Sequence, residues 1–76
     1  MHITLSVFMV LPDGQKVRNK AVQLEEGSTV ANAVDLFSIS DDWVWLYVIN
    51  HRQIVQRYDT LKEGDHLMVF PPMEGG

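Results

Sequence analysis

Only one stretch of this chain has the apolar spacing of a helix, and the apolar residues elsewhere follow strand patterns. Between residues 29 and 37, four apolar side chains fall at i, i+3, i+4 and i+7, which places them on one helix face. These four are Val30, Ala33, Val34 and Phe37. Ser28 precedes them and can cap the first free amides. The sequence therefore predicts a single helix of about two and a half turns that packs on a sheet.

Strand patterns occupy both sides of this helix. Ile3, Leu5 and Val7 alternate with Thr4, Ser6 and Phe8, which predicts a first strand with one buried face. The tetrapeptide 11–14, Leu-Pro-Asp-Gly, is typical of a tight turn and predicts a hairpin. We expect strands over residues 2–10, 17–24, 43–49, 54–55 and 65–70. The predicted order is ββαββ, in a mixed sheet of about five strands with one main helix.

Composition restricts the classes of function. With 76 residues the chain forms one domain, and such a domain buries only about 60% of its unfolded surface, so we expect modest stability. No cysteine is present, which excludes disulfides and thiolate metal sites. His2, His51 and His66 lack the spacing of a zinc motif, so we expect them to be solvated and expect no bound metal.

Charge and hydropathy restrict the partners and the location that we expect for the protein. The net charge of −4 argues against a nucleic-acid partner and favours a basic protein partner. The longest apolar stretch, residues 43–49, is too short to span a bilayer, and the N-terminus has no signal-peptide pattern, so we expect no membrane association and a cytoplasmic location.

The last residues of the sequence predict an extended arm. Pro71 and Pro72 cannot donate ladder hydrogen bonds, so they should end the last strand and stiffen the base of the arm. Gly75 and Gly76 lack Cβ atoms and fit a narrow channel. We therefore divide the chain into a domain over residues 1–70 and an extended C-terminal tail over residues 71–76. The tail consists of Pro71, Pro72, Met73, Glu74, Gly75 and Gly76.

The segment from Gly64 to Gly76 resembles the C-terminal signature of the MoaD family, the small subunit of molybdopterin synthase. That signature is Gly-Asp, an alternating strand, Phe-Pro-Pro, two variable residues and Gly-Gly, and all of its parts are present here. The stretch from Val48 to Arg57 is similar to the ThiS family, the sulfur carrier of thiazole synthesis. Both families have the ubiquitin-like β-grasp fold, in which a hairpin, a crossover helix and a last strand form one sheet. The resemblance thus implies an α+β protein of the β-grasp class.

The resemblance also implies a chemistry centred on Gly76. In these families an adenylating enzyme of the ubiquitin-activating type uses ATP to activate the C-terminal carboxylate, and a sulfur donor converts it to a thiocarboxylate. A free carboxylate with a pKa near 3.5 is ionised at neutral pH and a poor electrophile, so activation is needed. The carrier binds no cofactor itself and is not an enzyme alone, although it can be the small subunit of a synthase. Its implied acceptor is a molybdopterin synthase large subunit or a thiazole synthase.

Two other functions fit the same residues. A ubiquitin-like modifier would use Gly75-Gly76 to form isopeptide bonds with lysines of target proteins. A plain interaction module would leave the tail chemically inert. Pro71-Pro72 favours the sulfur carrier, and the sequence leaves the receiving pathway open.

Strand alternation predicts where a partner docks. If Leu67 and Val69 lie in the core, Met68 and Phe70 point to the sheet face without the helix, where they would be exposed beside the tail. Further candidates for this surface are Phe8, Trp45 and Tyr47. Both parities of the 43–49 strand are apolar, so the pattern does not decide which of its side chains are buried.

Overall fold

The computed structural model describes residues 1–72 of the chain. The elements in chain order are β1 (His2–Val7), β2 (Lys20–Gln23), α1 (Val30–Asp35), a 3-10 helix η1 (Asp41–Trp43), β3 (Leu46–Ile49), β4 (Gln53–Val55) and β5 (His66–Phe70). Three strands come after the helix, so the full order is ββαβββ. The short strand predicted over residues 54–55 is present as β4, and the predicted order ββαββ left it uncounted. The extended tail predicted for Met73 to Gly76 lies outside the described residues.

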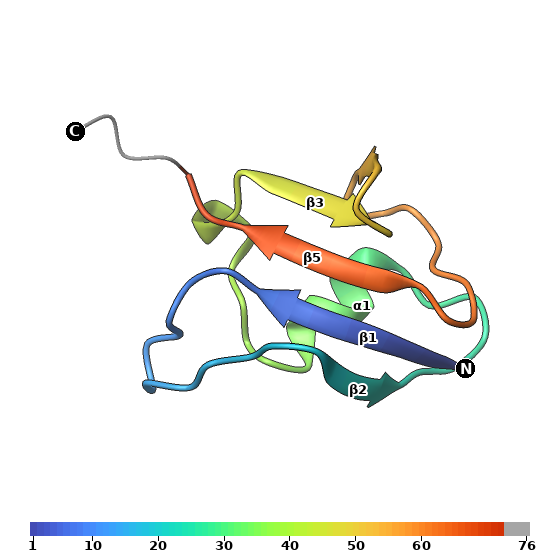
Figure 1. Ribbon diagram of the computed structural model, residues 1–76, viewed down its shortest axis with the longest axis horizontal. Coiled ribbons are helices and arrows are strands. Elements are labelled where there is room, and N and C mark those ends of the chain that lie inside the picture. The colour runs from blue at the N-terminus through green and yellow to red at the C-terminus, as the bar shows by residue number, and fades with distance from the viewer. Residues whose placement is uncertain (73–76) are drawn as a thin grey trace.

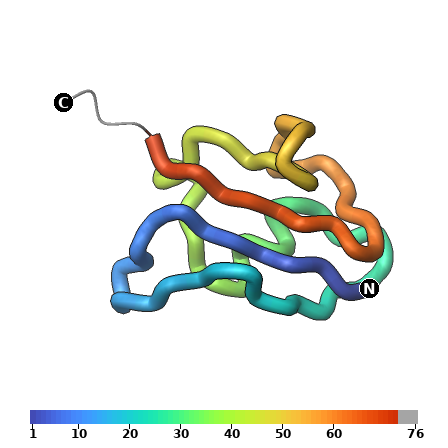
Figure 2. The backbone as a smooth tube through the Cα atoms, in the orientation of Figure 1, coloured from blue at the N-terminus to red at the C-terminus, as the bar shows by residue number. Residues whose placement is uncertain are grey.

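All five strands form one mixed sheet in the order β2-β1-β5-β3-β4 (Figure 1). β1 pairs antiparallel with β2 and parallel with β5, and β3 pairs antiparallel with both β5 and β4. β5 is therefore the central strand. Figure 2 shows the start of β1 and the end of β5 at opposite ends of the sheet, because these two strands run in the same direction. This arrangement is the β-grasp predicted from the sequence.

The core lies between α1 and one face of the sheet, which we call the helix face. Val30, Ala33 and Val34 of α1 are buried there against alternate residues of the strands. The strand residues are Ile3, Leu5, Val7, Val22, Tyr47, Ile49, Val55, Leu67 and Val69. Leu5, Leu67 and Val69 are fully buried, so the predicted core parity of β1 and β5 is confirmed.

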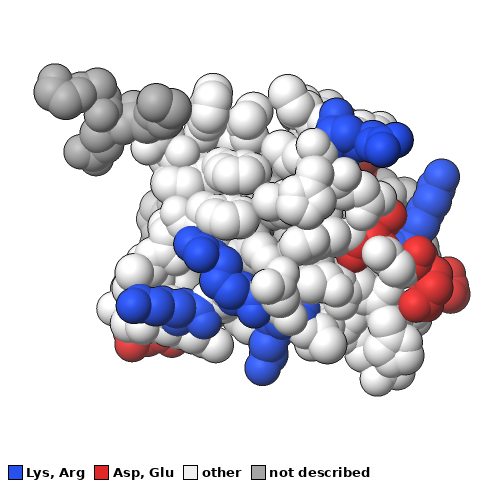
Figure 3. Space-filling view, in the orientation of Figure 1, with Lys and Arg blue, Asp and Glu red and all other residues white. Residues whose placement is uncertain are grey.

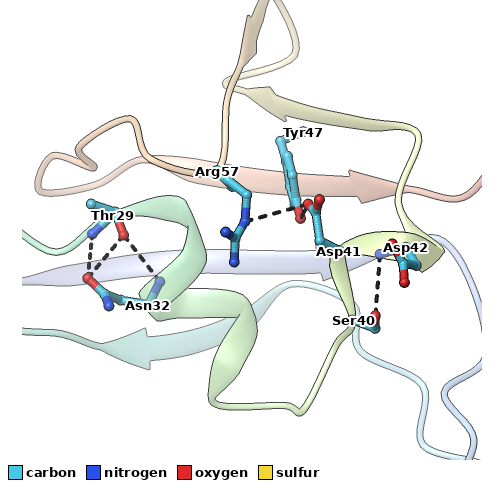
Figure 4. Close-up of polar contacts among 7 residues, drawn as sticks. All are labelled: Thr29, Asn32, Ser40, Asp41, Asp42, Tyr47 and Arg57. Atoms are coloured by element: carbon cyan, nitrogen blue, oxygen red, sulfur yellow. Dashed lines mark hydrogen bonds and ion pairs between the residues drawn. The ribbon is translucent and has the colours of Figure 1, made fainter.

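The helix is shorter than predicted and is capped by a different residue. α1 covers six residues, and its N-cap is Thr29 rather than Ser28. The Thr29 hydroxyl accepts from the Asn32 amide, and the Asn32 side chain accepts from the Thr29 amide, which makes a capping box (Figure 4). At the other end the predicted last turn has tighter i→i−3 bonds, since the Phe37 amide donates to the Val34 carbonyl and the Ser38 amide to the Asp35 carbonyl. Ser38 then takes a left-handed backbone with a φ of 56°, which ends the turn.

Two turns set the lengths of the neighbouring strands. The predicted turn over residues 11–14 is confirmed, because the Gly14 amide donates to the Leu11 carbonyl at 2.8 Å. β1 nevertheless stops at Val7 and β2 starts at Lys20, so both strands are shorter than predicted and a long connection joins them. The predicted turn at Asn50-His51 is also confirmed: both residues have positive φ, 56° and 65°, which is typical of a type I′ turn.

The 43–49 segment contains less strand than its composition predicts. Residues 41–43 form the 3-10 helix η1, which is capped by the Ser40 hydroxyl, and β3 begins only at Leu46 (Figure 4). β-branched and aromatic side chains raise strand propensity, but here the chain must first pass from the helix side of the sheet to its place beside β5. The pairing of β3 with β5 fixes the register, with Leu46 opposite Phe70 and Val48 opposite Met68.

Candidate docking face and tail base

The sheet face opposite the helix carries a continuous apolar surface. Side chains of directly paired residues lie on the same face, so the register puts Leu46 beside Phe70 and Val48 between Met68 and Ile54. Figure 3, which looks onto this face, shows mainly uncharged side chains across its centre. We call this surface the open-face patch and define it by its accessible apolar residues, Phe8, Trp45, Leu46, Val48, Ile54 and Phe70.

Phe8 and Phe70 form the end of the patch nearest to the tail. Their rings stack with 4.7 Å between centroids and 4° between planes, and both side chains are half-buried. The Phe8 amide also donates to the Val69 carbonyl at 2.8 Å, which holds the two segments together beyond the end of β1. The structure thus brings together two of the residues that the sequence predicted for the surface. Pro71 follows Phe70 directly, so the patch and the base of the tail are adjacent.

Trp45 supplies the most exposed aromatic group at this end of the sheet. Its side chain is 57% exposed, and its amide donates to the Phe70 carbonyl at 2.8 Å. Together with Leu46 and Val48 it lines a shallow apolar depression of about 310 Å³. His51, Met68 and Phe70 complete the lining. The placement of Trp45 agrees with its prediction as a surface candidate.

Two of the predicted surface residues are placed differently. Met68 does point to the open face, but its side chain is 8% exposed because residues of β1 and β3 flank it on the central strand. It forms the floor of the depression rather than an exposed contact. Tyr47 is 7% exposed and lies in the core on the helix face, so its prediction as an interface residue is wrong. Because both parities of the 43–49 segment are apolar, the sequence pattern did not show that Tyr47 is buried.

The Tyr47 hydroxyl reaches the far edge of the core and is held there. It donates to the Asp41 carboxylate at 2.8 Å, and Arg57 lies 3.7 Å from the same oxygen atom (Figure 4). Burial, and then the hydrogen bond and charge of Asp41, raise the pKa of the Tyr47 hydroxyl. The phenol therefore stays protonated, and it ties η1 to β3. Asp41 therefore has a structural role, since it accepts from Tyr47 and lies beside Arg57.

A polar cluster adjoins the patch at the other end of β5. The His66 Nε2 atom lies 2.9 Å from the hydroxyl of Ser6, which is buried, and the same hydroxyl accepts from the Asn19 amide. The His51 ring meets the His66 ring edge-on at 5.2 Å. Burial, and then repulsion by His51, lower the pKa of His66. The expectation that all three histidines are solvated is wrong for His66, whereas His2 and His51 are exposed.

The Gly-Asp pair of the sequence signature fixes the start of β5. Gly64 has a φ of 83°, which suits a residue without Cβ. Asp65 is 9% exposed, and its carboxylate accepts from the Lys62 amide and from the Asn50 side chain. Asn50 in turn accepts from the His66 amide at 2.9 Å. These bonds set the register of β5, and the register decides on which face of the sheet Phe70 lies.

The predictions for the tail residues are not tested by the structure. Met73, Glu74, Gly75 and Gly76 lie outside the described residues, so their roles stay predictions, as does the role of Pro71 and Pro72.

Within residues 1–72 no group of three or more acidic or histidine side chains could hold a metal ion. Over the same residues no helix is long and apolar enough to cross a membrane. Residues that the sequence did not single out are Leu46, Val48 and Ile54, which the pairing of β3 with β5 and β4 would have revealed.

No protein-family profile matches the chain, and no curated protein matches its sequence. The fold is similar to that of SAMP1 from Haloferax volcanii, known from a crystal structure. The two chains are 21% identical, the superposition covers 100% of each, and the TM-score is 0.75. This likeness shows that the chain has a ubiquitin-like β-grasp fold.

Proposed function

We propose that the chain is a carrier protein of the MoaD and ThiS type, which is adenylated at the Gly76 carboxylate and then carries sulfur there as a thiocarboxylate. The observation that carries the proposal is the junction at the end of β5. The strand that ends at Phe70 lies at the centre of an apolar sheet face, and the Pro-Pro and Gly-Gly pairs come after it within six residues. An enzyme seated on the open-face patch would meet the base of the tail directly.

A C-terminal carboxylate can undergo both chemical steps of this proposal, adenylation and sulfur transfer. A Gly76 carboxylate oxygen attacks the α-phosphorus of ATP, pyrophosphate leaves, and an acyl adenylate forms. Hydrosulfide then attacks the acyl carbon, AMP leaves with its oxygen, and loss of the proton gives the thiocarboxylate. The adenylating enzyme supplies the catalytic groups. The carrier supplies the docking surface and an arm that, fully extended from Pro71, reaches about 20 Å at roughly 3.3–3.6 Å per residue.

The signature residues support this assignment over a generic interaction module. Gly64 and Asp65 have a structural function at the start of β5, and Phe70 belongs to the patch at its end. An inert module would need neither a glycine pair after two prolines nor an aromatic stack at the base of the arm. The acceptor in this proposal is a synthase subunit of molybdopterin or thiazole formation.

Pyrophosphate exchange tests the activation step. Purified protein, ATP, labelled pyrophosphate and a candidate adenylating enzyme should give exchange that depends on the carrier, and the enzyme alone should give none. A variant that ends at Gly75 is the matched control, since it keeps the residues of the domain and presents its terminal carboxylate one residue short of the position that Gly76 gives it. Equal exchange with both chains would refute the proposal. The test also requires that the mature protein ends at Gly76, which its intact mass establishes.

A ubiquitin-like modifier is the second candidate, because the fold and the glycine pair suit it equally. The two differ in product. After cleavage behind Glu74 by a glutamate-specific protease, a modifier leaves a branched Gly-Gly remnant on target lysines, whereas a sulfur carrier leaves target lysines unchanged. Proteomics on cells that express a tagged chain therefore separates them, and abundant remnants that vanish with a Gly76 deletion would favour the modifier.

A further inference from the structure

The charge of this acidic protein is unevenly distributed, and a basic segment lies beside the open-face patch. The chain has a net charge of −4, yet residues 14–24 contain Lys16, Arg18 and Lys20 and no acidic residue. These residues lie in the connection from β1 to β2 and at the start of β2. Figure 3 shows Lys and Arg side chains gathered over that segment, next to the uncharged centre of the open face. Half of the basic residues are thus concentrated at one border of the patch.

Arg18 is held in a defined position within this cluster. Its guanidinium carbon lies 4.3 Å from the centroid of the Phe8 ring, and its Nε donates to the Val7 carbonyl at 3.1 Å. Phe8 in turn stacks on Phe70. Stacking and the Nε bond remove much of the freedom that a surface arginine has, so less entropy is lost when a ligand binds. Among residues 1–72 no hydrogen bond or ion pair involves the two Nη atoms.

This geometry leaves an arginine fork that is oriented and unused within residues 1–72. The planar guanidinium can donate two parallel hydrogen bonds to a carboxylate, which a lysine cannot do. The stack Arg18-Phe8-Phe70 places that fork at one end of an apolar surface. A complementary ligand therefore carries a carboxylate beside apolar side chains. A polyanion such as a nucleic acid fits less well, because the other side chains of the patch are apolar and the chain as a whole is acidic.

We propose that Arg18 is a carboxylate-binding residue of the open-face patch, and that the partner protein places an Asp or Glu against it with apolar side chains on Phe70 and its neighbours. The inference rests on the proposed function only in taking that partner to be the adenylating enzyme. It also revises the sequence expectation of a basic partner, since net charge does not describe this face. Lys16 and Lys20 add attraction over a longer range without the geometry of the fork.

A pair of short peptides tests the recognition without any enzyme. The probes are N-acetyl-Leu-Glu-Leu-amide and the same peptide with Gln in place of Glu, titrated into ¹⁵N-labelled protein and followed by NMR. The Glu peptide should bind with millimolar affinity, shift the Arg18 Nε–H signal and perturb Phe8 and Phe70. The Gln peptide should bind about fivefold more weakly, the upper range for an exposed charge pair.

Two variants separate the fork from the charge. Arg18→Lys keeps the positive charge and loses the bidentate geometry, so it should abolish most of the difference between the two peptides. Arg52→Lys makes the same change at an exposed arginine of the turn after β3 and should leave that difference unchanged. Equal binding of both peptides by the wild type, an unchanged preference in Arg18→Lys, or no shift from either peptide would overturn the inference. Inorganic phosphate, titrated in place of the peptides, should bind the wild type no better than it binds Arg18→Lys. If the wild type bound phosphate clearly better than the Glu peptide, the site would be a phosphate site instead.

An adenylation assay then connects the residue to the proposed function. With an adenylating enzyme that accepts the wild type, Arg18→Lys should raise the KM for the carrier several-fold and leave kcat near its original value, because docking and not chemistry is affected. An enzyme that accepts wild type and Arg18→Lys with equal KM would show that this partner does not use the fork. Failure of every adenylating enzyme with the wild type would count against the proposed function alone, since the peptide titration decides the role of Arg18 independently.

Discussion

Replacing Leu67 with alanine tests the placement of the central strand. Leu67 is fully buried on β5, between Leu5 of β1 and Ile49 of β3, so its side chain has core neighbours on both flanks. Leu→Ala changes at such positions cost about 3–5 kcal/mol, because the transfer energy of the side chain and the cavity left behind add together. A domain of 76 residues has a total stability of about 4–11 kcal/mol. Leu67→Ala should therefore remove a large part of it.

Phe70→Ala is the matched comparison on the same strand. Phe70 is half-buried on the open face, and its best-defined contact is the stack on Phe8. Such a stack contributes about 0.5–1.5 kcal/mol beyond the area it buries. We expect Phe70→Ala to destabilise by about 1–2 kcal/mol, clearly less than Leu67→Ala.

Urea denaturation followed by tryptophan fluorescence measures both variants. The slope m should stay near the wild-type value, since the surface exposed on unfolding hardly changes. In thermal melts Leu67→Ala should lower Tm by about 12–40 °C, from a loss of about 3–5 kcal/mol at roughly 4–8 °C per kcal/mol for a domain of this size. If Phe70→Ala proved as destabilising as Leu67→Ala, β5 would present its other face to the helix, and the open-face patch would be wrongly assigned.

Three further predictions concern the patch and its supports. Trp45→Ala should change stability little, because the side chain is 57% exposed, but it should weaken docking of the adenylating enzyme by about 2 kcal/mol or more if Trp45 is a hot spot. Calorimetric titration measures this against Leu36→Ala, which removes an exposed apolar side chain at the end of α1, on the other side of the sheet. Stability should fall as the pH drops below about 6.5, the ordinary pKa of histidine, because the pKa of His66 is lower in the folded than in the unfolded state and the unfolded state then binds more protons. In urea melts at successive pH values, His66→Gln should flatten this part of the curve of stability against pH, and a slope identical to that of the wild type would contradict the role of His66. Asn50→Ala should destabilise by about 1–3 kcal/mol through the loss of the bonds to Asp65 and His66, and Asn50→Gly should cost less because glycine accepts the φ of 56°; the reverse order in denaturation would show that the turn is not the constraint.

Most of the architecture could be predicted because the periods in the sequence are unambiguous where one face is buried. Ile3, Leu5 and Val7 alternate cleanly, and the helix residues Val30, Ala33 and Val34 have the spacing of one face. Each pattern corresponds to side chains that lie in the core. The ends of the elements were harder to predict. Strand β1 stops at Val7 because the chain bends after it, and nothing in the apolar pattern of residues 8–10 announces that bend.

The site was predicted less completely, for reasons that lie in pairing rather than in local sequence. Trp45 and Tyr47 share one strand parity, so alternation alone would treat them alike. Tyr47 lies within β3 and in the core, whereas Trp45 precedes the start of β3 at Leu46 and is 57% exposed. Met68 was assigned to the correct face, but its burial depends on neighbours from two strands. Arg18 gave no signal, since its value as a ligand comes from stacking on Phe8 and from a hydrogen bond to Val7, eleven residues away in the sequence.

The central claim is that the Gly76 carboxylate is the reacting group, and intact-protein mass spectrometry tests it most directly. Wild-type protein is incubated with an adenylating enzyme that exchanges pyrophosphate in its presence, together with ATP, Mg²⁺ and sulfide. The mass should rise by about 16 Da as sulfur replaces one carboxylate oxygen, and tandem spectra should locate the change at Gly76. The chain ending at Gly75 should keep its original mass. A mass increase of the same size in the truncated chain, or one located at any residue other than Gly76, would contradict the account.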